Sequence, residues 1–195
     1  MSTERKKSIQ EEWSNVSLKS SQSDDLVLRT NSYFSQSALM FYKAYIIKRL
    51  NPRSSDLWLD VCCGGGPNSI ILALNYDCRI VSFDISFEAL RHGQKMKNHF
   101  NLDKIDFINA DVFHLPFRDD IFDGAIATQS FSYYPLTEQK TLFNDLFPLI
   151  KKNGTFLLSD VTTGSKDYYL FNIPTYRNLL HETGFTIVEE SGWGN

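Results

Sequence analysis

The stretch Leu57-Trp-Leu-Asp-Val-Cys-Cys-Gly-Gly-Gly-Pro-Asn-Ser69 decides the fold expected of this chain. Leu57–Asp60 predicts the end of a buried strand, and residues 61–66 predict a tight loop with few side chains. Pro67 suits the first position of a helix, where its missing N–H costs nothing. Glycine lets a ligand approach the backbone, and a helix N-terminus offers free N–H donors and a positive dipole end. The stretch therefore predicts a ligand-binding loop between a strand and a helix.

Two classes of cofactor use such a loop. The dinucleotide fingerprint is G-x-G-x-x-G, but Ser69 stands where its third glycine belongs. Asp60 closes the strand just before the loop, and a carboxylate fits an ammonium group better than a pyrophosphate. Asp84 ends the next predicted strand, Arg79–Asp84, about 20 residues after Gly64, where parallel sheets place a carboxylate against ribose hydroxyls. The alternative role for Asp84 is to cap the following helix, although Ser86 could do so.

Three stretches together resemble the class I S-adenosylmethionine-dependent methyltransferases, in family order and with family spacing from about residue 57 to residue 188. Within that family they are most similar to the small ubiquinone/menaquinone-type (type 11-like) subgroup. The three are Leu59-Asp-Val-Cys-Cys-Gly-Gly-Gly66, Asn109-Ala-Asp-Val-Phe-His-Leu-Pro-Phe-Arg-Asp-Asp-Ile-Phe-Asp123 and Leu146-Phe-Pro-Leu-Ile-Lys-Lys-Asn-Gly-Thr-Phe-Leu-Leu-Ser159. A departure from the family pattern is Cys62, where the family most often has Gly or Ala.

The resemblance implies S-adenosyl-L-methionine as the cofactor. The residues expected to bind it lie at carboxyl ends of predicted strands, where open α/β sheets bind ligands: Asp60, Gly64, Gly66, Asp84, Ile85, Asp111, Val112 and Gln129. By family position, the two glycines pass under the methionine and ribose, and Asp60 holds the ammonium group directly or through water. Asp84 takes the ribose hydroxyls and Ile85 lies against the adenine. Asp111 accepts from the adenine amino group with the Val112 N–H on the ring. Gln129, together with its neighbours Thr128 and Ser130, borders the methyl group.

The acceptor side is expected at Ser130-Phe-Ser-Tyr-Tyr-Pro135. Tyr133 or Tyr134 could hydrogen-bond a substrate, shape an aromatic pocket or offer a π-face to the sulfonium. The alternative is that one ring packs under the loop and the other is exposed. No residue is identified as the general base or as another catalytic residue. Cys62 and Cys63 are interpreted as packing residues, and the four histidines lack metal-ligand spacing, so no metal is expected.

The expected fold class is α/β: a Rossmann-like, doubly wound, mostly parallel sheet with helices on both faces. Residues 1–30 are expected to form a polar, partly mobile segment, and residues 31–195 are expected to form one methyltransferase domain whose helix at 31–50 covers the sheet. Further strands are expected at Ile105–Asp111, Phe122–Thr128, Thr155–Val161 and Phe185–Glu189, with helices at Thr137–Ile150 and Pro174–Thr183. Asn153-Gly154 is expected to turn the chain into the fifth strand, and Gly184 to end the last helix at its C′ position. The family's seventh strand is expected to be missing, which gives a six-stranded order 3-2-1-4-5-6 and an exposed edge that could pair with a second copy.

Composition limits the other possibilities. The chain has 195 residues, 42% of them hydrophobic, with a net charge of −3, so a nucleic-acid partner is not expected. No apolar run reaches the length of a membrane span, and three cysteines suit a reduced, cytoplasmic setting.

The expected function is methyl transfer to a small-molecule acceptor, such as a small aromatic, a quinone-like ring, an amine or a lipid-linked molecule. One alternative is a non-catalytic S-adenosylmethionine-binding protein on the same fold. The other is an NAD-dependent oxidoreductase, which Asp60, Ser69 and the stretch around Asp111 disfavour.

Overall fold

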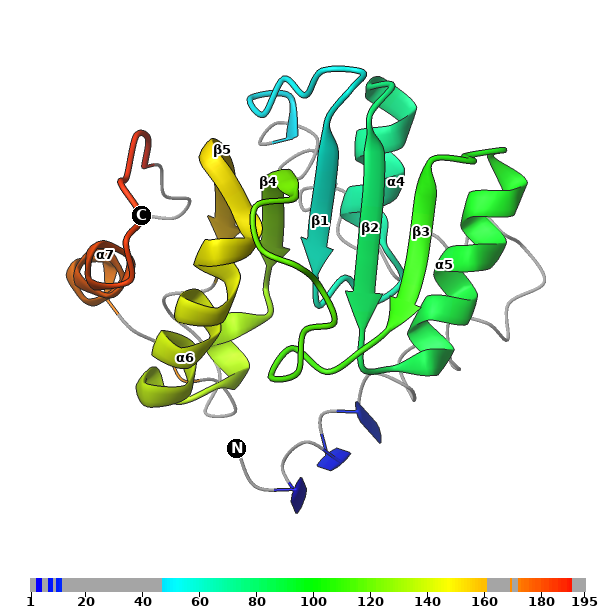
Figure 1. Ribbon diagram of the computed structural model, residues 1–195. Helices are drawn as coiled ribbons and strands as arrows, with labels where there is room; N and C mark the ends of the chain where they lie inside the picture. Colours follow the sequence, from blue (N-terminus) through cyan, green and yellow to red (C-terminus); the bar gives the residue numbers. More distant parts are fainter. Residues whose placement is uncertain are drawn as a thin grey trace, which may run out of the picture.

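The fold is a five-stranded parallel sheet with helices on both faces, as the alternation of strands and helices predicted (Figure 1). The computed structural model describes residues 3–4, 7–8, 10–11, 47–160, 169 and 172–190. The strand order is β3-β2-β1-β4-β5. The elements are β1 (Leu57–Val61), α4 (Pro67–Asn75), β2 (Arg79–Asp84), α5 (Phe87–His99), β3 (Ile105–Asn109), β4 (Phe122–Thr128), η1 (Phe131–Tyr133), α6 (Leu136–Leu146), η2 (Phe147–Leu149), β5 (Ile150–Ser159) and α7 (Ile173–Glu182).

The sheet separates two apolar cores because successive residues of a strand point to opposite faces. On one face, side chains of α4 and α5 such as Leu72 and Met96 pack against Ile80 and Ile126. On the other face, α6 contributes Leu142, Phe143 and Leu146, which pack against strand residues that include Leu59 and Ala125. Burial on both faces explains why the central strands β1 and β4 are mostly apolar.

Most of residues 1–50, which were expected to form a polar segment and a covering helix, lie outside the described residues. Ile47, near the end of that expected helix, is buried against the core on the α4 and α5 face. Gln10 donates from Nε2 to the Ile85 carbonyl at 3.3 Å. In Figure 1 the described N-terminal pieces, in blue, lie by the carboxyl ends of the strands. No helix among the described residues is long and apolar enough to cross a membrane.

The fifth strand begins earlier than predicted. The sequence predicted a turn at Asn153–Gly154 before a strand at residues 155–161, whereas β5 starts at Ile150. Ile150 pairs with Phe122 and Thr155 pairs with Gly124, so residues 151–154 lie opposite Asp123 alone and the register shifts there. Asn153, within this irregular stretch, has a φ of 65°. The preceding helix α6 is correspondingly shorter than predicted, because Pro148 leads the chain into η2.

The predicted sixth strand is wrong for the part of the chain that the structure describes. Residues 185–190 follow α7 as irregular chain, and the sheet order ends at β5. The Phe185 ring instead packs on the rings of Phe143, Phe147 and Phe156, with centroids 6.3, 5.0 and 5.1 Å away. Val188, predicted to lie within a strand, is 91% exposed. Aromatic packing therefore holds this segment against α6 and β5 without a strand ladder, and pairing of the sheet edge with a second copy stays a prediction.

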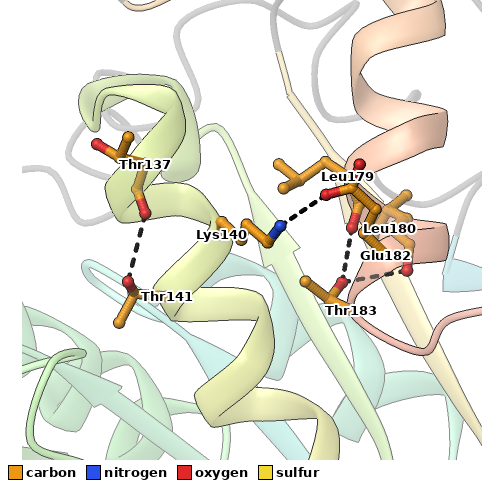
Figure 2. Close-up of polar contacts among 7 residues, drawn as sticks. All are labelled: Thr137, Lys140, Thr141, Leu179, Leu180, Glu182 and Thr183. Atoms are coloured by element: carbon orange, nitrogen blue, oxygen red, sulfur yellow. Dashed lines mark hydrogen bonds and ion pairs between the residues drawn. The ribbon is translucent and has the colours of Figure 1, made fainter.

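The helix before that segment ends as the sequence predicted. Gly184 follows α7 with a φ of 98°, and Phe185 N–H donates to the Leu180 carbonyl, which is the glycine-dependent closure of a helix C-terminus. Thr183 Oγ1 also donates to the Leu179 carbonyl at 2.8 Å, and Lys140 of α6 pairs with Glu182 of α7 at 2.7 Å (Figure 2). The Lys140–Glu182 pair is about half exposed, so water screens it and it contributes little to stability.

The centre of the sheet depends on a glycine opposite a tryptophan. Gly124 of β4 is in register with Trp58 of β1, and a Cβ placed on Gly124 would lie 2.5 Å from the indole ring. Trp58 is 2% exposed, so the ring has little room to move.

Gly124→Ala should therefore lower the free energy of unfolding by about 1–3 kcal/mol through overpacking. Chemical denaturation would measure this loss. In a Trp58→Phe background the same substitution should cost much less, because the smaller ring leaves space for the methyl group. An equal cost in both backgrounds would show that the indole is not the obstacle.

Candidate active site

The glycine loop at the carboxyl end of β1 follows a left-handed path. Cys62, Gly64 and Gly66 have φ values of 51°, 56° and 70°. Cys63 N–H donates to the Phe83 carbonyl of β2 at 2.9 Å, and Gly66 N–H donates to the Cys63 carbonyl at 2.9 Å. The loop is thus a tight turn attached to the neighbouring strand, and it delivers the chain to the N-terminus of α4.

Asp60 ends up at the N-terminus of α4 and has no exposed surface. Its Oδ2 accepts from the Ser69 hydroxyl at 2.6 Å and from the Ser69 N–H at 3.2 Å. Its Oδ1 accepts from Asn68 Nδ2 at 3.2 Å. A carboxylate at the positive end of a helix is favourable, and these donors offset its burial.

Asn68 and Ser69 also connect α4 to the neighbouring strands. Asn68 Nδ2 donates to Thr128 Oγ1 at the end of β4 at 2.9 Å, while its Oδ1 is buried without a hydrogen-bond partner. The Ser69 hydroxyl lies 2.6 Å from the Ser82 hydroxyl of β2. Ser69, noted in the sequence only as a missing glycine, therefore bonds helix α4 to both β1 and β2.

Asp84 lies at the carboxyl end of β2 and is 7% exposed. Its Oδ2 accepts from the Gly64 N–H and its Oδ1 from the Ser86 N–H, each at 2.8 Å. Ser86 itself caps α5, because its hydroxyl accepts from the Ala89 N–H at 3.3 Å. Burial raises the pKa of Asp84 despite these backbone donors, which act to lower it. Asp84 is thus tied to the glycine loop.

The end of β3 adds a further acid. Asp111 is 24% exposed, and it accepts from the Phe113 N–H at 3.0 Å and lies 3.2 Å from His114 Nδ1. Val112 beside it is buried in the core. Asn109, which the sequence did not single out, donates to the carbonyls of Asp84 and Ile85 at 3.0 Å each. This amide fixes the end of β3 against the end of β2.

The chain leaves β4 through a sharp corner. Gln129 is exposed, has a φ of 52° and donates its N–H to the Ser159 carbonyl of β5 at 2.7 Å. Ser130 is 7% exposed. Asp160, at the end of β5, then accepts from the N–H groups of Phe131 and Ser132 at 2.8 and 2.9 Å. Asp160 has no motif signal, because only the fold brings it within reach of residues nearly thirty positions away.

Tyr133 and Tyr134 are both buried, each 6% exposed, so neither ring is the exposed one that the packing interpretation expected. The Tyr134 ring packs edge-on against Phe113 at 5.3 Å. Burial raises the pKa of Tyr134 far above its usual value, and the charges of the Asp84 and Asp111 carboxylates raise it further. The Tyr134 phenol therefore lies within electrostatic reach of the glycine loop and the strand-end acids.

Several carboxylates at this end of the sheet lie close enough to Cys62 to influence its thiol. Burial raises the pKa of the Cys62 thiol, and the charges of Asp84, Asp60, Asp111 and Asp160 add to the effect. The Cys62 thiol therefore stays protonated at neutral pH, which agrees with its interpretation as a packing residue. Among the described residues no cluster of His, Cys, Asp and Glu could hold a metal ion.

Gly66 has a packing role that the sequence did not indicate. A Cβ on Gly66 would lie 2.6 Å from the Phe107 ring of β3, and a Cβ on Gly93 of α5 would lie 2.8 Å from the Gly65 carbonyl. The loop is thus pressed between β3 and α5. Gly66 is required by its contact with Phe107 and by its positive φ, whether or not a ligand passes over it.

The chain belongs to a methyltransferase family, since the model of the "Methyltransferase domain" family matches residues 53–183. O-methyltransferase rstn1 of Aspergillus nomiae is 23% identical over 158 residues, which cover 73% of this chain and 69% of that protein. A demethylmenaquinone methyltransferase of Oceanobacillus iheyensis is 25% identical over 153 residues, which cover 75% of this chain and 63% of that protein. The chain thus spans roughly two thirds of the length of these two curated relatives.

Solved structures share the fold. The [4+2]-cyclase SpnF superposes with a TM-score of 0.72 at 20% identity, over 79% of this chain and 59% of that one. Phosphoethanolamine N-methyltransferase 2 of Haemonchus contortus, solved with S-adenosyl-L-methionine, gives 0.66 at 19% identity, over 74% of this chain and 36% of that one. At these identities the likeness concerns the fold, and it does not assign a substrate.

Ser69→Ala should lower the free energy of unfolding by about 1.5–3 kcal/mol, because it removes a buried hydrogen bond to the Asp60 carboxylate. Ser82→Ala is the matched control, since it removes only the hydroxyl–hydroxyl link and should cost about 0.5–1.5 kcal/mol. Urea denaturation measures both. A larger loss for Ser82→Ala than for Ser69→Ala would contradict the assigned role of Ser69.

Proposed function

We propose that this chain is an S-adenosyl-L-methionine-dependent methyltransferase that acts on a small-molecule acceptor. We place it in the small ubiquinone/menaquinone-type subgroup. The observation that carries the proposal is the set of carboxylates gathered around the glycine loop: Asp60, Asp84 and Asp111. Carboxylates only accept hydrogen bonds, so they suit a cationic ligand rich in donors and oppose a pyrophosphate.

The residues present fit this cofactor. Each Asp84 oxygen accepts a backbone N–H at 2.8 Å, and because a carboxylate oxygen can accept more than one hydrogen bond, both can also accept from ribose hydroxyls. The buried Asn68 Oδ1 has no partner, and a donor from the ligand's ammonium group or its water would satisfy it. Asp60 is fully covered, so it would act on that ammonium group through Asn68 or through a water.

The remaining expected contacts follow the strand ends. Asp111 would accept from the adenine amino group, with the Val112 N–H on the ring and the Ile85 side chain against its face. Gly64 and Gly66 would pass under the methionine and ribose, and exposed Gln129 would border the methyl group. These roles are proposals that a ligand-bound structure would test residue by residue.

When bound, S-adenosyl-L-methionine supplies an electrophilic methyl group on a sulfonium. The chain's own task is to align an acceptor with that group and to exclude water. Tyr134 suits this task better than Tyr133, because the Tyr134 phenol lies close enough to Asp84 and Asp111 for their charges to raise its pKa. Its raised pKa keeps it protonated at neutral pH, so it can donate a hydrogen bond to an acceptor but cannot serve as the general base.

Methyl transfer must be measured directly, because one protein of this fold is described as a cyclase. We would supply S-adenosylmethionine with a tritiated methyl group and offer fractionated small molecules: aromatics, quinone-like rings, amines and lipid-linked compounds. Transfer to one fraction supports the proposal. Cofactor binding without transfer to any fraction would favour a non-catalytic binding protein, and binding of NAD alone would overturn both.

Tyr134→Phe should reduce turnover two- to tenfold, the equivalent of one neutral hydrogen bond of about 0.5–1.5 kcal/mol. The affinity for S-adenosylhomocysteine should stay within twofold. Tyr133→Phe, which removes a second buried phenol from the same turn, should change turnover less. Steady-state kinetics with the acceptor found above measures both variants. Equal turnover for both variants and the parent would leave the two rings as packing residues.

A further inference from the structure

Hydrogen bonds to residues outside the turn stabilise the turn that carries Tyr133 and Tyr134. Ser130 stands at the N-cap of η1 but makes no side-chain cap. The free N–H groups of Phe131 and Ser132 are satisfied instead by Asp160 Oδ2, at 2.8 and 2.9 Å. The Ser132 hydroxyl donates to Asp160 Oδ1 at 2.6 Å. One carboxylate from the end of β5 therefore makes three hydrogen bonds to the first two residues of η1.

Two backbone contacts complete the arrangement. Gln129 N–H donates to the Ser159 carbonyl, so consecutive residues of the β5 end hold the chain where it leaves β4 and where it enters η1. On the other side, the Ser132 carbonyl accepts from the Tyr169 N–H at 2.6 Å. All three polar groups of Ser132 are thus occupied by chain that follows β5.

The fixed turn places aromatic side chains next to the cofactor-binding loop. Phe131 is fully buried against Phe143 of α6, with ring centroids 5.0 Å apart, and it anchors the turn in the core. Tyr134 follows two residues after Ser132 and belongs to the apolar core against which Cys62 of the glycine loop packs. A shift of the turn would therefore move the Tyr134 hydroxyl relative to the site of methyl transfer.

We propose that Asp160 is the positioning residue of the acceptor side: its three hydrogen bonds to Phe131 and Ser132 fix η1 and thereby orient Tyr134 toward the acceptor. The effect on catalysis rests on the proposed function, whereas the hydrogen bonds between Asp160 and η1 do not depend on it. Asp160 acts through the turn and touches neither the acceptor nor the reacting atoms.

The geometry separates two substitutions at this position. Asp160→Ala removes every acceptor and leaves two backbone donors unsatisfied. Asp160→Asn keeps one carbonyl oxygen for those donors, and its amide can donate to the Ser132 hydroxyl oxygen. The conservative variant should therefore preserve the turn, while alanine should release it. Asp145→Ala, at an exposed position of α6, is the matched control for loss of an acid.

The first measurement is hydrogen exchange of the Phe131 and Ser132 amides in the full chain. Exchange should be at least tenfold faster in Asp160→Ala than in the parent, Asp160→Asn or Asp145→Ala. The second is the affinity for S-adenosylhomocysteine by calorimetry, which should stay within threefold in all variants. Parent-like exchange in Asp160→Ala would overturn the proposal whatever the reaction is.

The third measurement is steady-state kinetics with the acceptor identified by the methyl-transfer assay. Asp160→Ala should raise the acceptor KM and lower kcat, each at least fivefold, and Asp160→Asn should restore both to within threefold of the parent. Loss of cofactor affinity with unchanged acceptor kinetics would overturn the positioning role. If the parent binds no S-adenosylhomocysteine, the proposed function fails, and the exchange experiment still decides whether Asp160 holds η1.

Discussion

Two buried carboxylates on adjacent central strands hold the glycine loop, and the rest of the candidate site depends on this constraint. Asp60 of β1 accepts hydrogen bonds from Asn68 and Ser69 in the first turn of α4. Asp84 of β2 accepts a hydrogen bond from the Gly64 N–H of the loop. Burying two acids is costly unless donors surround them, and here the donors are the loop and the helix that any ligand would contact. The same bonds thus fold the loop and set its charge.

Across the site, the ends of β4 and β5 play the corresponding role. Asp160 holds the turn that follows β4, as Asp84 holds the loop that follows β1. A reaction between a cofactor and an acceptor needs both partners held at fixed positions, because alignment supplies much of the rate acceleration. We infer that the strand-end acids divide this work: those of β1 and β2 serve the cofactor, and that of β5 serves the acceptor.

The sequence predicted what depends on local pattern. Strands β2 and β4 have the predicted bounds, and Ser86 and Gly184 cap their helices as expected, because caps and apolar runs are determined by neighbouring residues. Contacts distant in sequence were missed: Asp160 on η1, and Phe107 against Gly66. The segment after α7 was predicted to be the sixth strand of the resembled family's sheet. Its leading Phe185 packs instead on three rings of α6, η2 and β5, and sequence periodicity cannot reveal that preference.

The most direct test of the account is the pH dependence of S-adenosylhomocysteine binding, measured by calorimetry on the parent and on Asp84→Asn. Burial raises the pKa of Asp84 above its usual value near 3.9, and ribose hydroxyls need the ionised form. Affinity should therefore be constant above that raised pKa and fall up to tenfold per pH unit below it. Asp84→Asn should bind about 1.5–3 kcal/mol more weakly at neutral pH and should lack this transition. Equal affinity and the same pH profile in both proteins would contradict the central role of Asp84.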